Sequence, residues 1–287
     1  MFDSYEILIE NKIIDVLKAK GTEYDELTNA MSYSASAGGK RIRPKLLMEF
    51  MRVAGGNPED ALNFAVALEM IHTYSLIHDD LPCMDNDDMR RGKPSCHKAF
   101  GESTALLAGD ALLTESFGLA AKTKNVPADR VVKALAKLSE CAGVNGMIGG
   151  QVIDLKYENS KAPLEVVLEL YRLKTGALLK AAATIGCILA GADDIKTENA
   201  CKIAEKIGLA FQIRDDILDI IGDEKVLGKP IGSDSEQNKS TYVSIVGVEN
   251  AQKDVIKLTD EAISLLSAFN DTNNLKKFAE SMVTRLN

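Results

Sequence analysis

Residues 61–94 read ALNFAVALEMIHTYSLIHDDLPCMDNDDMRRGKP, an apolar run that ends in a dense cluster of charge. Five carboxylates and three cations lie within fifteen residues, from Asp79 to Lys93. These groups would repel one another, and burying them would be costly, unless something doubly charged lay among them. Clustered carboxylates are the ligands that Mg²⁺ prefers, and Mg²⁺ commonly bridges them to substrate phosphates. The stretch therefore predicts a divalent metal and a polyanion, with Arg90 and Arg91 holding phosphate oxygens.

The apolar run before Asp79 predicts a central helix. Residues 57–60 (NPED) supply a capping Asn, a Pro at the first helical position and acids in the first turn. The residues that follow are apolar on all sides, which is typical of a buried helix. Pro82 should interrupt this helix. A turn there could bring Asp85 back to the metals that Asp79 binds.

A second acidic cluster, Asp215, Asp216 and Asp219, supports the metal interpretation. Asp215 and Asp219 stand one turn apart, so on a helix their carboxylates share a face. The alternative is an acidic, solvated helix surface, which is the usual role of a charge run. The apolar flanks, residues 203–209 and 217–221, favour the metal site.

A third motif, GGKRIRP at residues 38–44, predicts a phosphate clamp. Its two glycines allow close approach of the backbone to a ligand. Lys40 and Arg43 lie one turn apart if a helix begins there. The alternative is a solvated helix start, where these cations would be unfavourable unless an anion is bound.

The order of these three motifs resembles the trans-isoprenyl diphosphate synthases, specifically bacterial-type farnesyl diphosphate synthases. The resemblance runs from about Gly38 to about Tyr242. It implies head-to-tail condensation of isopentenyl diphosphate with dimethylallyl or geranyl diphosphate, which gives farnesyl diphosphate and pyrophosphate. It also implies about three Mg²⁺ ions. One departure is Val243, where the family often has proline after the segment KSTY.

The resemblance also implies roles for individual residues. The predicted metal ligands are Asp79, Asp80, Asp85, Asp215, Asp216 and Asp219. The residues expected around the allylic diphosphate and the cation formed from it are Arg90, Lys174, Thr175, Gln212, Lys229 and Lys239. The residues expected at the isopentenyl diphosphate site are Lys40, Arg43, His72 and Arg91. Tyr74, with the small Ser75 beside it, resembles a floor that stops growth at fifteen carbons.

Composition narrows the class of protein. The formal charge of −8, from 34 basic and 42 acidic residues, argues against a nucleic-acid surface. The five cysteines are scattered and include no CxxC pair, which suits a reducing cytosol. We find no signal-peptide core and no apolar run that approaches a membrane span free of charge or glycine. We expect a soluble, cytoplasmic protein, and the apolar excess of its helices suits a homodimer.

Helical periodicity continues through the rest of the chain, and no strand alternation persists. Further helices are expected over residues 1–20, 24–31, 103–122, 128–141, 164–190, 201–221, 250–267 and 272–286. The fold class is therefore all-α, a single domain over residues 1–287 with ten or more helices around a central cavity. The resemblance implies the isoprenoid synthase fold.

Three segments leave alternatives open. The glycines of residues 143–154 favour close helix packing, with Gln151 and Asp154 as supporting groups near the site. The KTG sequence at 174–176 could kink its helix and direct carbonyl oxygens into a cavity, although a lysine that reaches outward to solvent is the simpler interpretation. Residues 222–242 could form a lid or an ordinary surface loop, and the sequence does not say whether they are ordered without substrate.

Four other functions compete with the farnesyl synthase. A geranylgeranyl diphosphate synthase would differ in product length alone. A terpene cyclase would have no use for a second diphosphate site. A non-catalytic regulatory subunit would be expected to lose aspartates from one cluster. A metal-dependent phosphohydrolase would need a positioned water and a base, for which the sequence offers no candidate.

Overall fold

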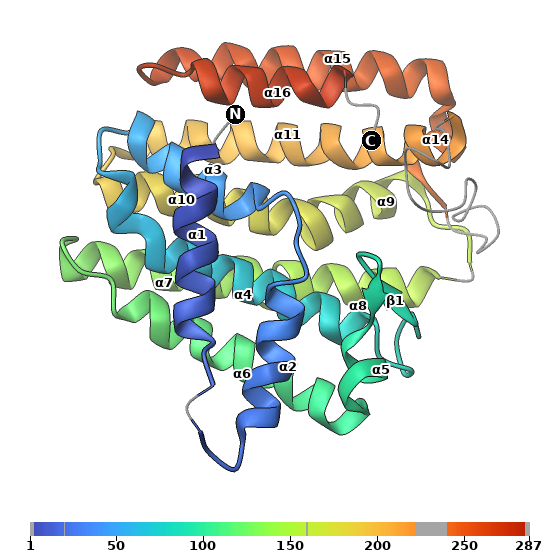
Figure 1. Ribbon diagram of the computed structural model, residues 1–287. Coiled ribbons are helices and arrows are strands. Elements are labelled where there is room, and N and C mark those ends of the chain that lie inside the picture. Colours follow the sequence, from blue (N-terminus) through green and yellow to red (C-terminus); the bar gives the residue numbers. More distant parts are fainter. Residues whose placement is uncertain (1–2, 20, 159, 222–239, 285–287) are drawn as a thin grey trace.

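The computed structural model describes residues 3–19, 21–158, 160–221 and 240–284. Apart from one short hairpin, the regular structure of these residues is helical (Figure 1). The first half contains α1 (Asp3–Val16), α2 (Asp25–Ala35), α3 (Ile42–Val53), η1 (Pro58–Ala61), α4 (Leu62–Asp79), β1 (Met89–Arg90), β2 (Lys93–Pro94), α5 (Cys96–Phe100), α6 (Glu102–Ala121) and α7 (Ala128–Ala142). The second half contains α8 (Met147–Tyr157), α9 (Leu164–Leu170), η2 (Tyr171–Gly176), α10 (Ala177–Ala190), α11 (Asp194–Ile221), α14 (Tyr242–Val246), α15 (Val248–Leu265), η3 (Leu266–Ala268) and α16 (Asn273–Thr284).

Helix α4 is the central helix that the sequence predicts. It packs against α6 and α3, and α1 and α2 cross it (Figure 1). The eight residues from Phe64 to Ile71 are all buried, which explains why this helix is apolar on every side. The predicted cap is also present: Asn57 accepts the Glu59 N–H at 3.4 Å and opens η1, a 3₁₀ turn that leads into α4.

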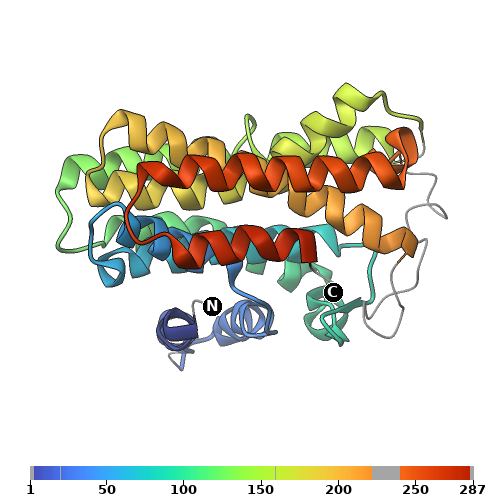
Figure 2. The same cartoon turned by 90° about the horizontal axis from the view of Figure 1, so that it is seen from above.

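Outer helices extend the bundle around α10 and α11. Helix α10 packs on α3, α7 and α11, while α15 and α16 run alongside α11 (Figure 2). One apolar cluster of buried side chains extends from Tyr5 to Ala279 and includes residues of most of these helices. The all-α fold class and the ten or more helices are thereby confirmed. The division of the chain into a single domain stays a prediction.

The predicted helix of residues 164–190 is continuous but contains a π-helix. Helices α9 and α10 are joined by η2, a six-residue π-helix over Tyr171–Gly176. The structure thus shows the less favoured alternative for KTG at 174–176, a distortion of the helix, because the wider turns of a π-helix break the α-helical carbonyl ladder. By length and hydropathy alone, Leu164–Ala190 could cross a membrane. It contains charged residues and glycines, so it is not the uninterrupted apolar run that the sequence analysis considered. However, 72% of its apolar window is buried inside the protein, and a core helix meets the same criterion.

Several predicted boundaries were wrong. Helix α3 begins at Ile42, so Lys40 precedes it and does not share a helical face with Arg43. Helix α11 begins at Asp194, earlier than the expected start at residue 201. The hairpin β1–β2 was not predicted, because two-residue strands are too short to alternate. Its turn residues, Arg91 and Gly92, have φ angles of 52° and 75°, as a type I′ turn requires.

Candidate active site

The first acidic cluster lies at the C-terminal end of α4 and folds back on it. The N–H of Asp85 donates to the carbonyl oxygen of Asp79 at 2.8 Å, and the N–H of Asn86 donates to Leu81 at 3.1 Å. The predicted turn is therefore present. Burial raises the pKa of Asp79 to about 6, and the nearby Asp85 adds to the rise while Lys174 opposes it. Asp79 and Asp85 thus lie within electrostatic reach of each other.

Asp80 and Arg90 pair with each other. Arg90 Nε donates to Asp80 Oδ1 at 2.9 Å, and Arg90 Nη2 lies 3.3 Å from Asp87 Oδ2. Asp80 is buried. The structure therefore places Arg90, predicted to hold phosphate, in a bridge between two carboxylates of the first cluster. Asp80, predicted to bind metal, faces this arginine.

Lys174 projects from the π-helix to the first cluster. Its Nζ donates to Asp154 Oδ2 at 2.5 Å. Although burial lowers the pKa of Lys174, the carboxylates of Asp154, Asp79 and Asp85 outweigh it and raise the pKa. The interpretation of Lys174 as an outward-reaching lysine is therefore wrong, and Asp154 supports the site as predicted.

Gly150 of α8 allows this arrangement. A Cβ atom at this position would lie 2.3 Å from the backbone nitrogen of Lys174, which no real side chain could tolerate. Helix α8 and the π-helix therefore touch backbone to backbone, as the glycines of residues 143–154 indicate. The close approach also explains how Asp154, one turn along α8 from Gly150, reaches the Lys174 ammonium.

The second cluster lies on α11, opposite the π-helix. Asp216 and Asp219 are buried, and Asp215 is partly buried. Gln212 accepts the hydroxyl of Thr175 at 2.9 Å, so these two predicted residues are in contact. Tyr171, which the sequence analysis missed, donates its hydroxyl to Asp216 Oδ2 at 2.5 Å. Its only signal in the sequence is a tyrosine in an apolar helix, one turn before Lys174.

A cationic group lies on the other side of the first cluster. Arg43 Nη1 is 3.4 Å from His72 Nε2. Burial, together with the charges of Arg43 and Arg91, holds the pKa of His72 well below its usual range, so the imidazole is neutral at pH 7. The buried Nε of Arg43 has no hydrogen-bond partner among the described residues. A buried donor without an acceptor, next to further cations, is the pattern of a site that an anion completes.

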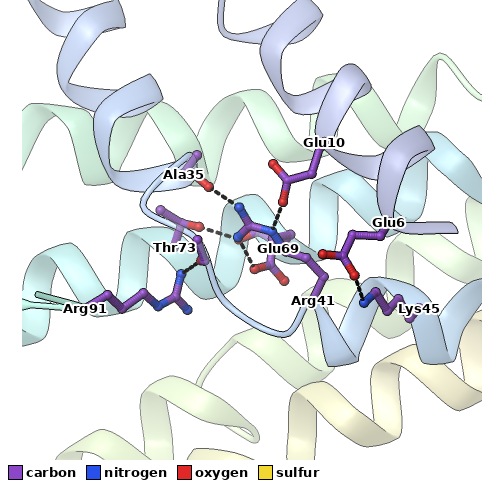
Figure 3. A network of polar contacts seen from close by, with 9 residues as sticks. Glu6, Glu10, Ala35, Arg41, Lys45, Glu69, Thr73 and Arg91 are labelled. Atoms are coloured by element: carbon purple, nitrogen blue, oxygen red, sulfur yellow. Dashed lines mark hydrogen bonds and ion pairs between the residues drawn. The ribbon is translucent and has the colours of Figure 1, made fainter. Parts of the chain in front are cut away.

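Arg41 of the GGKRIRP motif has a structural role. Its buried guanidinium bonds Glu69 Oε1 at 2.8 Å, Glu10 Oε1 at 2.7 Å and the carbonyl oxygen of Ala35 at 2.6 Å (Figure 3). Arg91 reaches the same loop and donates to the carbonyl oxygen of Gly38. The charge of Arg41 is therefore balanced by two carboxylates of the protein itself, Glu10 and Glu69. Arg41 fixes the loop, and the exposed Lys40 precedes it.

The end of the 222–242 segment is described only from Ser240 onward. Ser240 Oγ accepts the N–H of Ala162 at 3.0 Å, and the N–H of Tyr242 lies 3.1 Å from Asp216 Oδ2. The predicted diphosphate lysines Lys229 and Lys239 lie outside the described residues.

One cavity of about 510 Å³ connects the predicted parts of the site. Arg43 and His72 line one part of it, and Asp79 and Lys174 another. The rest is mainly apolar, with walls from Tyr74, Ser75, Leu113, Met147, Ile148, Val152 and Leu155. A second cavity of about 190 Å³ contains Asp154, Tyr171, Gln212 and Asp216, and Lys174 and Thr175 line both cavities.

The donor set suits Mg²⁺ held jointly with a diphosphate. Among the residues that the structure describes, no three His, Cys, Asp or Glu side chains form a group that could hold a metal ion by themselves. Mg²⁺ usually takes only one or two carboxylates and completes its shell with water and substrate phosphates. The raised pKa of Asp79 shows a carboxylate whose charge lacks compensation, which a divalent cation would supply.

The comparisons with known proteins agree with this geometry. Residues 24–282 match the polyprenyl synthetase family. The geranylgeranyl diphosphate synthase of Cyanophora paradoxa is 49% identical over 262 residues, which cover 90% of this chain and 87% of that protein. The farnesyl diphosphate synthase of Bacillus subtilis is 46% identical over 246 residues, 85% of this chain and 83% of that protein.

A solved structure extends the likeness to the whole fold. The crystal structure of geranylgeranyl pyrophosphate synthetase from Pyrococcus horikoshii matches with a TM-score of 0.91 and 30% identity, and covers 99% of this chain and 97% of that chain. This likeness confirms the isoprenoid synthase fold. The match over residues 24–282 and the relatives of 46–49% identity show that the chain belongs to the polyprenyl synthetase family, the enzymes that elongate prenyl chains.

Proposed function

We propose that the protein is a farnesyl diphosphate synthase, which adds isopentenyl diphosphate to dimethylallyl and geranyl diphosphate. The observation that carries the proposal is the cavity that is lined by Arg43 and His72, by Asp79 and Lys174, and by an apolar trough. An elongating enzyme needs these three parts together: two sites for diphosphates and a dry space for the growing chain.

The allylic diphosphate binds between the two acidic clusters. We propose that Asp79, Asp80, Asp85, Asp215, Asp216 and Asp219 hold about three Mg²⁺ ions, directly or through water. When bound, Mg²⁺ neutralises the diphosphate so that it can depart as pyrophosphate. Lys174 adds a positive charge at the first cluster, and we propose that Lys229 and Lys239 do so from the segment before Ser240. Arg90 acts from its bridge between Asp80 and Asp87.

The cation left on the allylic carbon needs electron-rich neighbours in a space without water. Thr175 and Gln212 are hydrogen-bonded to each other, and both line the cavity on the side of the second cluster. We propose that their oxygens, with the Lys174 carbonyl, stabilise the cation. When the isopentenyl double bond attacks this cation, the positive charge moves to the condensed product. That product then loses a proton to the departing pyrophosphate. No protein base is required.

Isopentenyl diphosphate binds at the cationic group without metal. Arg43, His72 and Arg91 are gathered there, and Lys40 stands at the open edge of the loop that Arg41 fixes. Neutral His72 donates one hydrogen bond, while the arginines supply the charge that a diphosphate needs. This second diphosphate site favours an elongating enzyme over a cyclase.

Tyr74 is the proposed chain-length floor. It is buried, it lines the apolar trough beside Ser75, and its ring packs edge-on against His78 with centroids 5.7 Å apart. We expect Tyr74→Ala to lengthen the product to twenty carbons or more, because the trough then continues along α4. Tyr74→Phe, which keeps the ring, should still give fifteen carbons. The proposal of a floor fails if Tyr74→Ala makes only the fifteen-carbon product.

The decisive assay is product analysis with Mg²⁺, labelled isopentenyl diphosphate and each allylic starter in turn. Fifteen-carbon product from both the dimethylallyl and the geranyl starter supports the proposal. A twenty-carbon product would instead favour the geranylgeranyl synthase, which the similarity to the Cyanophora enzyme also supports. Absence of elongation by the folded protein would contradict both and favour a cyclase or a regulatory subunit.

We also propose a cytoplasmic homodimer. Apolar side chains of α6 and α8 are exposed, among them Leu107 at 55% and Val152 at 61%. Exposed apolar side chains such as these are typical of a surface that a partner covers. All five cysteines are free thiols, as in a reducing compartment. Light scattering should give twice the 31.0 kDa chain mass, and a monomeric mass would contradict the dimer.

A further inference from the structure

Tyr171 connects the π-helix to the second acidic cluster. Its side chain is only 7% exposed, and its hydroxyl donates to Asp216 Oδ2 at 2.5 Å across 45 residues of sequence. Asp216 itself is 4% exposed. A hydrogen bond to a buried carboxylate is charge-assisted when the acid is ionised, so it is both strong and strongly orienting.

A second donor reaches the same oxygen from a third element. The N–H of Tyr242 lies 3.1 Å from Asp216 Oδ2 and 3.2 Å from the Tyr171 hydroxyl oxygen. The start of α14 is itself held in place, because the Tyr242 hydroxyl donates to Asp254 Oδ2 at 2.7 Å and Thr241 caps the helix. Both η2 and α14 therefore help to orient the Asp216 carboxylate.

The hydrogen bond between Tyr171 and Asp216 lies at the wall of the smaller cavity of the site. Tyr171, Asp216, Lys174 and Thr175 all line the cavity of about 190 Å³. A phenylalanine at position 171 would fill the same space in the core, so packing alone does not require a hydroxyl. The hydroxyl adds a hydrogen bond that orients the Asp216 carboxylate of the second cluster.

We propose that Tyr171 is a positioning residue that holds the Asp216 carboxylate in the orientation that receives Mg²⁺ together with the allylic diphosphate. This inference rests on the proposed function and adds a residue that lies outside both aspartate motifs. Hydrogen-bond partners of metal ligands typically change metal affinity about 10–100-fold when they are removed. Loss of the Tyr171 hydroxyl should therefore act on metal and allylic substrate, and leave isopentenyl diphosphate binding unchanged.

The test is calorimetric binding of a thiolo analogue of geranyl diphosphate, which does not ionise, over a series of Mg²⁺ concentrations. Tyr171→Phe should need about tenfold more Mg²⁺ than the wild type for half-saturation. In turnover, its apparent KM for Mg²⁺ and geranyl diphosphate should rise while that for isopentenyl diphosphate does not. Tyr171→His, which keeps a ring donor, should recover part of the loss.

The matched control is Tyr5→Phe. Tyr5 is another buried tyrosine that donates to a carboxylate, Glu49 Oε2 at 2.9 Å, but on α1 and away from both cavities. It should leave the Mg²⁺ dependence unchanged. The inference is overturned if Tyr171→Phe follows the wild-type Mg²⁺ curve, or if Tyr5→Phe shifts it equally, because general loosening would then explain the effect.

The wild-type protein separates this inference from the proposed function. Analogue binding that depends on Mg²⁺, and that Tyr171→Phe weakens, supports the positioning role even if no elongation is observed. Elongation by the wild type with an unshifted Tyr171→Phe curve overturns the positioning role alone. A wild type that never binds the analogue, at any Mg²⁺ concentration, overturns both.

Discussion

The two acidic clusters present the same carboxylates on differently built supports. The first lies where α4 ends, and a turn brings Asp85 back to Asp79. The second lies within the continuous helix α11, where the spacing of the residues already places the carboxylates on one face. Lys174 and Arg90 act electrostatically on Asp79 in the first cluster, and among the described residues the Tyr171 hydroxyl and the Tyr242 N–H contact Asp216 in the second.

The difference shows two ways in which a protein can prepare carboxylates for a metal ion. One leaves a buried charge without enough compensation, and the other fixes the direction of a carboxylate by hydrogen bonds. The negative charge of Asp79 is only partly compensated, since burial raises the pKa of this carboxyl to about 6 although the charges of Lys174 and Arg90 lower it. Asp216 accepts hydrogen bonds from the Tyr171 hydroxyl and the Tyr242 N–H among the described residues. The first cluster is thus destabilised until a cation binds, while the second is oriented in advance. Substitutions in the two clusters should have similar effects on catalysis and opposite effects on stability.

The largest expected effect is on turnover. Asp79→Asn and Asp216→Asn should each slow elongation about a thousandfold, because each removes a charge that holds the metal ions at the leaving diphosphate. Steady-state kinetics with geranyl diphosphate measures this. Asp88→Asn is the matched control, since that exposed carboxylate pairs with Lys98 and should leave the rate unchanged. A wild-type rate in either cluster variant would contradict the shared role.

The next effect tests the close backbone contact between Gly150 of α8 and Lys174 of the π-helix. In Gly150→Ala, the new Cβ meets the Lys174 backbone, so α8 and the π-helix must separate. We expect destabilisation of about 1–3 kcal/mol together with reduced elongation. Gly118→Ala on α6 is the control, because its Cβ meets nothing within 4 Å and should stabilise the helix slightly. Equal stability changes in the two variants would show that the close contact is absent.

The smallest expected effect is on stability in the absence of metal, where the Asp79 and Asp216 substitutions should change the free energy of unfolding in opposite directions. In EDTA at pH 7, Asp79→Asn should raise the free energy of unfolding by about 1–2 kcal/mol, because the buried charge disappears. Asp216→Asn should lower it by about 1–2 kcal/mol, because two charge-assisted hydrogen bonds weaken. Denaturant unfolding measures both changes. Two changes of the same sign would remove the distinction between the clusters.

The pH dependence provides an internal check on Asp79. Its pKa in the folded protein, about 6, lies above the ordinary value of 3.8, so the native state binds its proton more tightly. The wild type should therefore lose stability relative to Asp79→Asn as the pH rises from about 4 to about 6, and no more above that range. A constant difference between the two proteins would show that Asp79 titrates normally.

Much of the site could be predicted because its chemistry is local in sequence. The clusters at Asp79 and Asp215 and the turn at Pro82 each leave a mark within a few residues, whereas the sequence around Lys174 favoured an outward-reaching lysine over the helix distortion that the structure shows. Periodicity likewise gave the helices. The two-residue hairpin and the start of α3 left no such signal, because one is too short and the other is fixed by Arg41 through Glu10 and Glu69, residues distant in sequence.

The contacts that could not be predicted all join distant segments. Tyr171 and Asp216 are 45 residues apart, and nothing in the helical pattern around Tyr171 says that its hydroxyl faces α11. Asp80 and Arg90 illustrate the same limit. Their types fit a metal ligand and a phosphate ligand, but only the position of the hairpin shows that they pair with each other.

The central claim, that both clusters act on one metal-bound diphosphate, is tested most directly by Mg²⁺-dependent binding of the geranyl thiolo analogue to Asp79→Asn, Asp216→Asn and the double variant. If the clusters act as one unit, each single substitution abolishes the increase in affinity that Mg²⁺ gives the wild type, and the double variant binds no more weakly than either. A single variant that keeps the full increase, or losses that simply add in the double variant, would show instead that the clusters bind separate ligands.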